Sequence, residues 1–292
     1  MRRACGVCVL SSLALSASVL AQDEASTAGP RWVEDERWTV RIEPAAWYVG
    51  LRGDVQLPRA SGEPGNFATD LSAFDLDDSS MLQPLGEITL RRGDWGIALR
   101  GFVYSQDSQA RGRAGRVGDL VIADGDRIVS SVEMVNFEIE GMYTLVKGAR
   151  SALSARDGYK VRWRVDALAG VRVLDTQWAI TSPDLVATDT SLLSAGAEET
   201  AFHPLVGMKV SATFVEQFTV DVKVDVGWLG LGDTSSYGVD ILVGGTWQPH
   251  RNFGVQVGYR ALAFGVSSGD GAGEYEFTGS AQGLYAGVVL EF

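Results

Sequence analysis

The chain has 292 residues, of which 37 are acidic, 25 are basic and 35 are glycine. Its net charge of −12 argues against a nucleic-acid partner, because neutralising phosphates requires a surplus of lysine and arginine. Both cysteines, Cys5 and Cys8, lie within the first 21 residues, so the sequence predicts no disulfide framework in the remainder.

Residues 1–21 have the pattern of a cleaved secretory signal peptide. Arg2 and Arg3 form a positive n-region, and a mainly apolar run of fewer than the ~20 residues of a spanning helix ends before Ala21. Without this peptide, 23 basic residues (25 − 2) face 37 acidic ones, a net charge of −14. Residues 22–37 are polar and acidic without periodicity, which predicts a short disordered leader.

Residues 38–292 predict a single all-β domain, because apolar and polar residues alternate with a period of two. In the clearest segment, 218–228, a stripe of valines is bounded by Phe218 and Trp228. A valine stripe between two aromatic residues is typical of a lipid-facing strand. We therefore predict a single closed antiparallel transmembrane β-barrel of about ten strands, with eight or twelve as alternatives. The ten segments are 38–51, 84–91, 95–105, 135–145, 161–173, 202–214, 218–228, 237–247, 253–261 and 275–292.

The predicted connections alternate in length. An even strand number places both chain ends in the periplasm, with short inner turns and longer outer loops. Short turns are expected at 93–94, 216–217 and 248–252, and outer loops at 58–83, 106–126, 179–199, 230–235 and 267–274. The connection 147–159 would be a long inner turn, and this departure leaves the strand number open.

The final segment predicts the strand that closes the barrel. Its lipid-facing stripe, which is also the expected signal to the barrel-assembly machinery, consists of Leu284, Ala286, Val288, Leu290 and Phe292. A secreted β-sandwich is the soluble alternative, and it would leave the terminal aromatic residue and the valine stripes unexplained.

The segment 247–260, WQPHRNFGVQVGYR, resembles the penultimate hairpin of small Gram-negative outer-membrane β-barrel proteins, the superfamily of OmpW-like and opacity-type barrels. The signal peptide and the final strand are similar to that group as well. The resemblance implies residence in the outer membrane, in contact with its lipid and lipopolysaccharide. Members range from adhesins to narrow porin-like pores, so the resemblance leaves the activity open.

If the apolar faces meet lipid, the opposite faces place eight basic and eight acidic residues in the lumen. Because charges removed from water need partners, we expect cross-strand ion pairs that fill a narrow barrel. The leading prediction is a structural or surface-interaction protein that acts through its extracellular loops, and a narrow pore for small solutes is the alternative. The sixteen residues are Arg41, Glu43, Glu87, Arg91, Arg100, Glu138, Glu140, Arg164, Asp166, Arg172, Lys209, Asp221, Lys223, Asp225, Asp240 and Arg260.

The sequence predicts no catalytic site, no cofactor and no resident metal ion. His203 is expected near the outer end of its strand, facing the lumen, without a serine or aspartate at adjacent same-face positions. Barrel proteases pair an Asp–His dyad with an Asp pair, which is not found around His203. An outer-rim hydrolase or acyltransferase that uses His203 on lipid or peptide stays the alternative.

The first outer loop carries Asp70, Asp75, Asp77 and Asp78. Carboxylates suit divalent cations such as Ca²⁺ or Mg²⁺, so a divalent cation is a candidate partner of this loop. The spacing does not complete a calcium-binding loop, and a solvated acidic loop is the simpler interpretation.

Overall fold

The computed structural model describes residues 37–59, 68–77, 80–112, 115–152, 159–183, 194–215 and 217–292. The chain divides into two units, Met1–Glu34 and Asp35–Phe292. The predicted signal peptide and residues 22–36 of the predicted leader lie outside the described residues. No helix in the described part of the chain is both long and apolar enough to cross a membrane.

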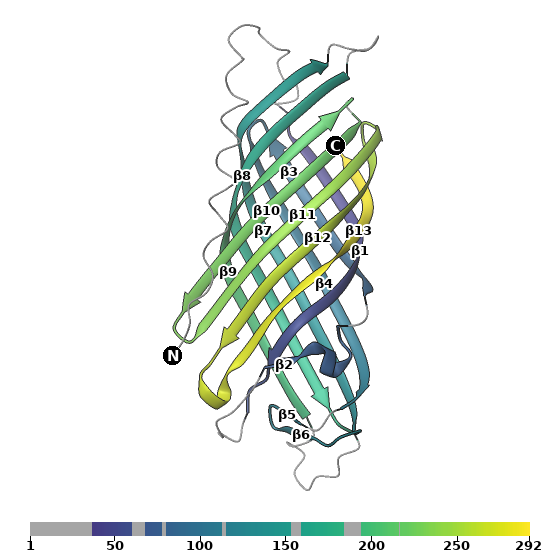
Figure 1. Ribbon diagram of the computed structural model, residues 1–292. Helices are drawn as coiled ribbons and strands as arrows, with labels where there is room; N and C mark the ends of the chain where they lie inside the picture. The colour runs from purple at the N-terminus through teal and green to yellow at the C-terminus, as the bar shows by residue number, and fades with distance from the viewer. Residues whose placement is uncertain are drawn as a thin grey trace. The chain divides into compact units, whose positions relative to one another are not determined.

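Ten long antiparallel strands form the sheet in the part of the second unit that the structure describes (Figure 1). They are β1 (Thr39–Gln56), β3 (Met81–Arg92), β4 (Trp95–Arg111), β7 (Arg127–Ala152), β8 (Tyr159–Thr181), β9 (Ser194–Phe214), β10 (Phe218–Leu231), β11 (Thr234–His250), β12 (Phe253–Ser268) and β13 (Tyr275–Glu291). Each strand pairs with its neighbours in chain order, and β13 pairs with β1. This pairing closes the ring and confirms the predicted ten-stranded barrel.

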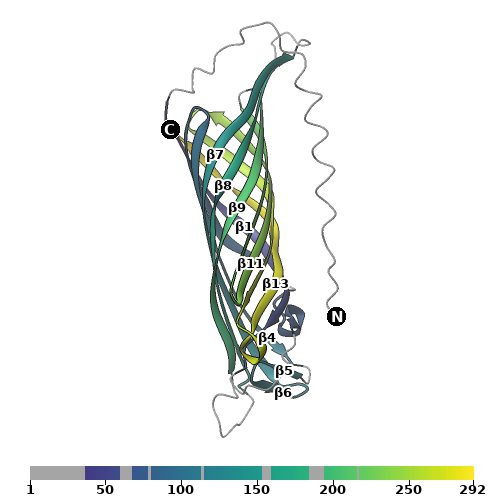
Figure 2. The same ribbon diagram turned by 90° about the vertical axis from the view of Figure 1, so that its left-hand side faces the viewer.

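The short elements all lie in connections at one end of the barrel. They are β2 (Thr69–Asp70), the 3₁₀ helix η2 (Leu71–Phe74), the hairpin of β5 (Gly115–Val117) and β6 (Leu120–Ile122), and η4 (Gly271–Gly273). Figure 2 shows β5 and β6 at the end opposite the C-terminus. We call the end with these longer connections the outer end, and the end with the C-terminus the inner end, following the usual asymmetry of outer-membrane barrels.

The outward face carries an apolar belt, as the alternation predicts. On β10, Val222, Val224 and Val226 are 38–45% exposed, whereas the charged residues between them are buried. Phe218 and Trp228 bound this stripe ten residues apart, which is about 23 Å across the membrane for a strand tilted near 45°. This height matches the apolar band of ~25 Å that outer-membrane barrels present to lipid.

Four strands continue past the belt and form what we call the outer wall: 105–111 of β4, 127–133 of β7, 175–181 of β8 and 194–200 of β9. Neighbouring outward residues change there from apolar to polar. Gly101, Phe137, Val173 and Phe202 form one row across the four strands, and Ser105, Glu133, Gln177 and Glu198 form a row further out. This change marks the outer boundary of the belt.

Two of the predicted outer loops are therefore too long. The alternation predicts loops at 106–126 and 179–199, but β4 continues to Arg111, β8 continues to Thr181, and β9 begins at Ser194. The alternation there is polar outward and apolar inward, the reverse of the lipid-facing pattern. The long inner turn expected at 147–159 is also wrong, because β7 and β8 pair as far as Ala152 and Tyr159.

The outer half of the interior holds an apolar core, which we call the outer plug. Strand residues contribute Trp47, Phe102, Trp178, Phe264 and Phe277, all at most 3% exposed. The connections add three residues from or next to η2 and three from the β5–β6 hairpin, all buried in the same cluster: Leu71, Phe74, Leu76, Val117, Leu120 and Ile122. The sequence pattern predicts a charged lumen and does not predict this apolar layer.

The hydrogen-bonded pairing of β3 with β4 stops next to Pro84. The pairing of β3 with β4 begins at Leu85, and Pro84 has no backbone N–H to continue it. Among the described residues, the rest of β4 beyond Phe102 pairs only with β7. Here η2 contacts both β1 and β4, and the Gln83 side chain donates a hydrogen bond to the Ser105 carbonyl at 2.8 Å. The described part of the first outer loop thus packs against the wall where β3–β4 pairing stops.

A side-chain cap holds this loop segment. The Asp70 carboxylate accepts a hydrogen bond from the Ser72 backbone N–H at 2.8 Å, at the start of η2. The hydrogen bonds from Ser72 lower the pKa of Asp70. Asp70 therefore has a local structural role in the loop.

Replacing Val224 by arginine tests which face meets lipid. Val224 lies midway along the belt, where an arginine facing the hydrocarbon core should cost about 2–4 kcal/mol. The exposed Ser235, in the β10–β11 hairpin, is the matched control, and Ser235→Arg should change stability by at most ~0.5 kcal/mol. Denaturant unfolding in phospholipid vesicles measures both. Equal costs for the two substitutions would contradict a lipid-facing belt.

Replacing Phe74 by alanine tests the outer plug. Phe74 is fully buried, so truncation should lower the free energy of unfolding by about 3–5 kcal/mol. Val121, on the β5–β6 hairpin, is 48% exposed, and Val121→Ala is the control expected to have little effect. Guanidinium unfolding in detergent micelles gives both values. A loop that merely rests on the rim would make the two costs similar.

Candidate functional site

The inner half of the lumen holds the charged residues that the sequence singled out. All sixteen lie on the inward faces of their strands, buried or half-buried. Each forms at least one ion pair within 4.0 Å with another member of the set. We divide the set into a deep network, next to the outer plug, and an inner vestibule, next to the inner mouth.

The deep network is organised around Glu138 of β7. Four cations from four other strands surround its carboxylate, which is fully buried. The distances from Glu138 are 2.9 Å to Arg260 Nη2, 3.1 Å to Arg172 Nε, 3.4 Å to Arg100 Nη1 and 3.6 Å to Lys223 Nζ. One carboxylate thus links β7 to β4, β8, β10 and β12 across the barrel.

Lys223 lies among three carboxylates. Glu138, Glu140 and Asp225 bring oxygen atoms within 4.8 Å of one another, close enough for the three to share a metal ion. The Lys223 ammonium contacts all three, at 3.0 Å from Asp225 and as a hydrogen-bond donor to Glu140. The chain's own ammonium group therefore supplies the positive charge that this acidic cluster requires.

Two arginines connect the deep network to its surroundings. Arg172 pairs with Asp225 at 2.8 Å, and Arg260 pairs with Asp240 at 2.7 Å. The Arg260 guanidinium also lies 5.0 Å from the centre of the Phe102 ring. Because a guanidinium is attracted to an aromatic face, this contact joins the deep network to the outer plug.

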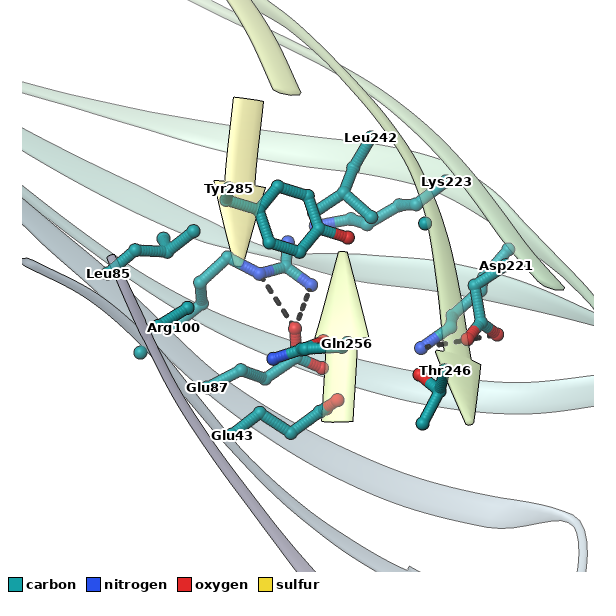
Figure 3. Close-up of a pocket in the computed structure, with 14 residues that line it drawn as sticks. Glu43, Leu85, Glu87, Arg100, Asp221, Lys223, Leu242, Thr246, Gln256 and Tyr285 are labelled. Carbon is teal, nitrogen blue, oxygen red and sulfur yellow. Dashed lines mark hydrogen bonds and ion pairs between the residues drawn. The ribbon is translucent and has the colours of Figure 1, made fainter. Parts of the chain in front are cut away.

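A small cavity separates the deep network from the inner vestibule (Figure 3). Its lining includes Glu43, Glu87, Arg100, Asp221 and Tyr285, which meet from strands on different sides of the barrel. Its volume is about 40 Å³, which is room for only a few water molecules. The lumen therefore holds space for water at this level, but not for a solute of metabolite size.

The inner vestibule is defined by seven charged residues: Arg41, Glu43, Arg91, Arg164, Asp166, Lys209 and Asp221. Arg91 binds both oxygens of Asp166, at 2.7 and 3.0 Å. Hydroxyl groups complete the coordination of two carboxylates: Thr144 donates to Asp166 at 2.7 Å, and Ser211 donates to Asp221 at 2.6 Å. The sequence pattern does not predict these hydroxyl contacts, because a period of two does not show which residues meet across strands.

The prediction for the position of His203 is partly wrong. The side chain faces the lumen as expected, but β9 begins at Ser194, which puts His203 near the middle of the strand and not near its outer end. It is 1% exposed, paired across the strands with Arg172, and its Nδ1 lies 3.3 Å from the Ser236 hydroxyl. His203 therefore lies at the boundary between the deep network and the outer plug.

Among the described residues of the first outer loop, the acidic side chains form no group of three close enough to share a cation. Asp70 caps Ser72, Asp75 ends η2 with a positive φ of 57°, and Asp78 lies outside the described residues. Within the described ranges, Glu138, Glu140 and Asp225 are the group of three acidic residues close enough to share a cation. A divalent cation on this loop therefore stays a prediction.

The closing stripe points outward. Leu284 and Phe292 are 61% and 66% exposed, and Ala286, Val288 and Leu290 share their face of β13. The intervening residues Tyr285 and Val289 are buried in the lumen. The stripe thus lies on the lipid-facing side of the strand that closes the ring.

No protein-family model matches the chain, and no curated protein matches it. Among solved structures, the outer-membrane protease OmpT of Escherichia coli is similar, at 10% identity, over 91% of this chain and 100% of the other, with a TM-score of 0.51. The toluene transporter TodX of Pseudomonas putida matches 87% of this chain and 89% of its own at 10% identity. Ail, the attachment invasion locus protein of Yersinia pestis, matches 87% of this chain and 97% of its own at 10% identity.

The likeness to OmpT shows the fold alone, because the sequences are so different. The TM-scores to TodX and Ail, 0.27 and 0.29, are too low to carry an argument. The closed ring, the apolar belt and the OmpT likeness together define an integral β-barrel of the outer-membrane type. The finer resemblance to OmpW-like and opacity-type barrels stays a prediction.

A double-mutant cycle tests the deep network. Glu138→Gln leaves four buried cations with one carboxylate fewer and should cost about 3–5 kcal/mol of unfolding free energy. Adding Lys223→Met removes one of those cations, so the double variant should be less destabilised than the sum of the singles by at least ~1 kcal/mol.

The half-exposed rim pair Lys147–Asp94, at 2.9 Å, provides the matched control cycle. Lys147→Met and Asp94→Asn should couple by less than ~1 kcal/mol, because solvent screens this pair. Urea unfolding in detergent measures both cycles. Additive effects at Glu138 and Lys223 would show that the two side chains are not energetically linked.

Proposed function

We propose that this protein is a non-conducting outer-membrane barrel that acts as a structural or surface-interaction protein through its extracellular part. The single observation that supports this most is the filling of the lumen by two successive layers. The deep network occupies the middle of the barrel, and the outer plug occupies the interior beyond it. A solute would have to break buried ion pairs and then displace packed aromatic side chains.

The cost of opening such a path is high. Separating one buried ion pair leaves an uncompensated charge, which costs about 3–5 kcal/mol, and Glu138 alone takes part in four pairs. The outer plug adds the fully buried side chains of Trp47, Phe74 and Phe277. The alternative of a narrow pore would require a continuous water-filled path through both layers.

The outer wall supports a role in surface contact. Its outward residues Asp107, Glu133 and Glu198 are exposed, beyond the apolar belt, on paired strands. Ordered strands hold these carboxylates in a fixed array, so a partner could bind without ordering a flexible loop. The partner that this array suits carries positive charge or brings divalent cations, and lipopolysaccharide bridged by such cations is one partner of that kind.

We propose no catalytic step at His203. A rim enzyme needs a histidine that a substrate can reach, and this side chain is 1% exposed beneath the outer plug. Its neighbour Ser236 is 3% exposed and equally enclosed. The pair has a ready structural role, because a buried histidine needs a hydrogen-bond partner.

Single-channel recording tests the closed lumen. The refolded barrel, checked by heat-modifiable migration on a gel, should give no steady conductance steps in a planar bilayer, whereas a porin measured alongside should. Regular ion steps from the folded protein would contradict the proposal.

Replacing Asp107, Glu133 and Glu198 together by serine should leave folding intact and reduce adhesion of cells that display the protein. Unchanged adhesion would remove the outer wall as the contact surface.

A further inference from the structure

The hairpin of β7 and β8 reaches further at the inner end than the neighbouring strands do. The pairing of β4 with β7 ends at Trp95 and Tyr143, whose stacked rings mark the inner boundary of the apolar belt. In contrast, β7 and β8 stay paired as far as Ala152 and Tyr159. The step from Tyr143 to Ala152 spans about 30 Å along the strand, or about 20 Å along the barrel axis at a tilt near 45°. Figures 1 and 2 show these two strands beyond the others at the end with the C-terminus.

We call residues 145–163 the inner hairpin, and one of its edges has no neighbouring strand among the described residues. On that side, the Thr144 N–H donates a hydrogen bond to the Asp94 carbonyl at 2.8 Å. From Val146 to Ala152, β7 pairs with β8 alone. An edge strand presents a row of N–H and C=O groups with which an added strand can pair. Residues 146–152 thus offer a backbone edge for strand addition.

The inner hairpin is basic in an acidic chain. It carries five basic residues and one acidic residue, a net charge of +4 (5 − 1), whereas the whole chain has a net charge of −12. Arg164 is not counted, because it pairs with Asp166 in the inner vestibule. The connections on either side in the ring, 93–94 and 215–217, contribute one acidic residue each, which leaves +2 (4 − 2). The five basic residues are Lys147, Arg150, Arg156, Lys160 and Arg162.

The two faces of the inner hairpin differ in chemistry. Lys147 and Arg162 lie on the inward face, which they share with Arg164. On the outward face, Val146 is 51% exposed, and the Trp163 ring lies next to Gly148. Because side chains alternate between the faces of a sheet, a strand with alternating acidic and apolar residues would match both.

We propose that the inner hairpin binds an extended acidic segment of a periplasmic protein, which adds as a strand along the free edge of β7. The acidic side chains of this segment lie on the face of Lys147 and Arg162, and its apolar side chains lie on the face of Val146. This site is independent of the proposed surface contact, because it is at the opposite end of the barrel.

Two other occupants fit the hairpin less well. Pairing of two copies of this chain along the same edge would bring two basic hairpins together, and like charges opposite each other are destabilising. Anionic lipid headgroups are at the belt boundary, whereas the hairpin extends about 20 Å past it. Charges in water act over only about 10 Å at 0.1 M salt, so much of the hairpin is beyond the reach of the headgroups.

A peptide titration tests the site. The full chain, refolded in maltoside detergent at low ionic strength, is titrated into a fluorescently labelled decapeptide of alternating glutamate and valine, and anisotropy is measured. We expect saturable binding of one peptide per barrel. The same peptide with four consecutive central residues N-methylated keeps its charge but loses those N–H donors, and should bind at least about tenfold more weakly. A decapeptide of alternating lysine and valine should not bind.

Charge reversal on the hairpin provides the second measurement. Lys160→Glu with Arg162→Glu brings the net charge of the inner hairpin from +4 to 0 (4 − 4) and should weaken binding of the glutamate–valine peptide at least about tenfold. The matched control, Arg52→Glu with Arg251→Glu, changes the overall charge equally at exposed positions outside the hairpin and should bind like the wild type. Heat-modifiable migration on a gel checks that each variant folds.

The outcomes separate the proposal from its alternatives. Equal binding of the N-methylated peptide would show attraction by charge without strand addition, and equal weakening in the control variant would show an effect of overall charge; either would overturn the proposal. The N-methyl comparison uses the wild type, so it decides even where the reversed variant does not fold. In phosphatidylcholine nanodiscs the peptide should bind as in detergent. If phosphatidylglycerol in the nanodisc abolishes binding, headgroups occupy the hairpin and the proposal is wrong.

Discussion

Backbone hydrogen bonding in a medium without water is the constraint on which the rest of this structure depends. Every N–H and C=O group that crosses hydrocarbon must be paired within the protein, and a closed ring of strands achieves this without an open edge. Pairing of β13 with β1 completes that ring here. Once the ring is closed, alternate side chains point either outward or into the lumen, and the chemistry of each layer follows from this division.

The lumen shows how a narrow barrel tolerates charge. Side chains from opposite walls meet, so an inward carboxylate can be surrounded by cations from several strands, as Glu138 is. The same narrowness excludes bulk water and makes each unpaired charge expensive. Further out, where the strands leave the membrane, polar residues point outward and the interior becomes apolar, as in a water-soluble domain. The interior of the barrel therefore has a charged layer and an apolar layer along one axis. The two layers meet where the Arg260 guanidinium lies against the Phe102 ring.

Much of this architecture could be predicted from the sequence, and the reason is the period of two. The alternation placed all ten strands and assigned the sixteen lumen charges to the inward face, because orientation is a local property of a strand. Partner identity is not local: it depends on the stagger between strands, so the Thr144–Asp166 bond and the convergence on Glu138 could not be derived. The sequence predicts loops where the structure has the outer wall, because the apolar stripe changes sides there, and the same shortened strand places His203 too near the rim.

The proline at position 84 has a consequence for how the wall of the barrel is held together. Backbone hydrogen bonds between β3 and β4 extend only as far as Leu85. Beyond that point η2, from the connection between β1 and β3, packs against β1, β4 and β7, and its residues Leu71 and Phe74 are buried in the outer plug. The outer part of this wall is therefore held by side-chain packing, whereas the rest is held by backbone hydrogen bonds between strands.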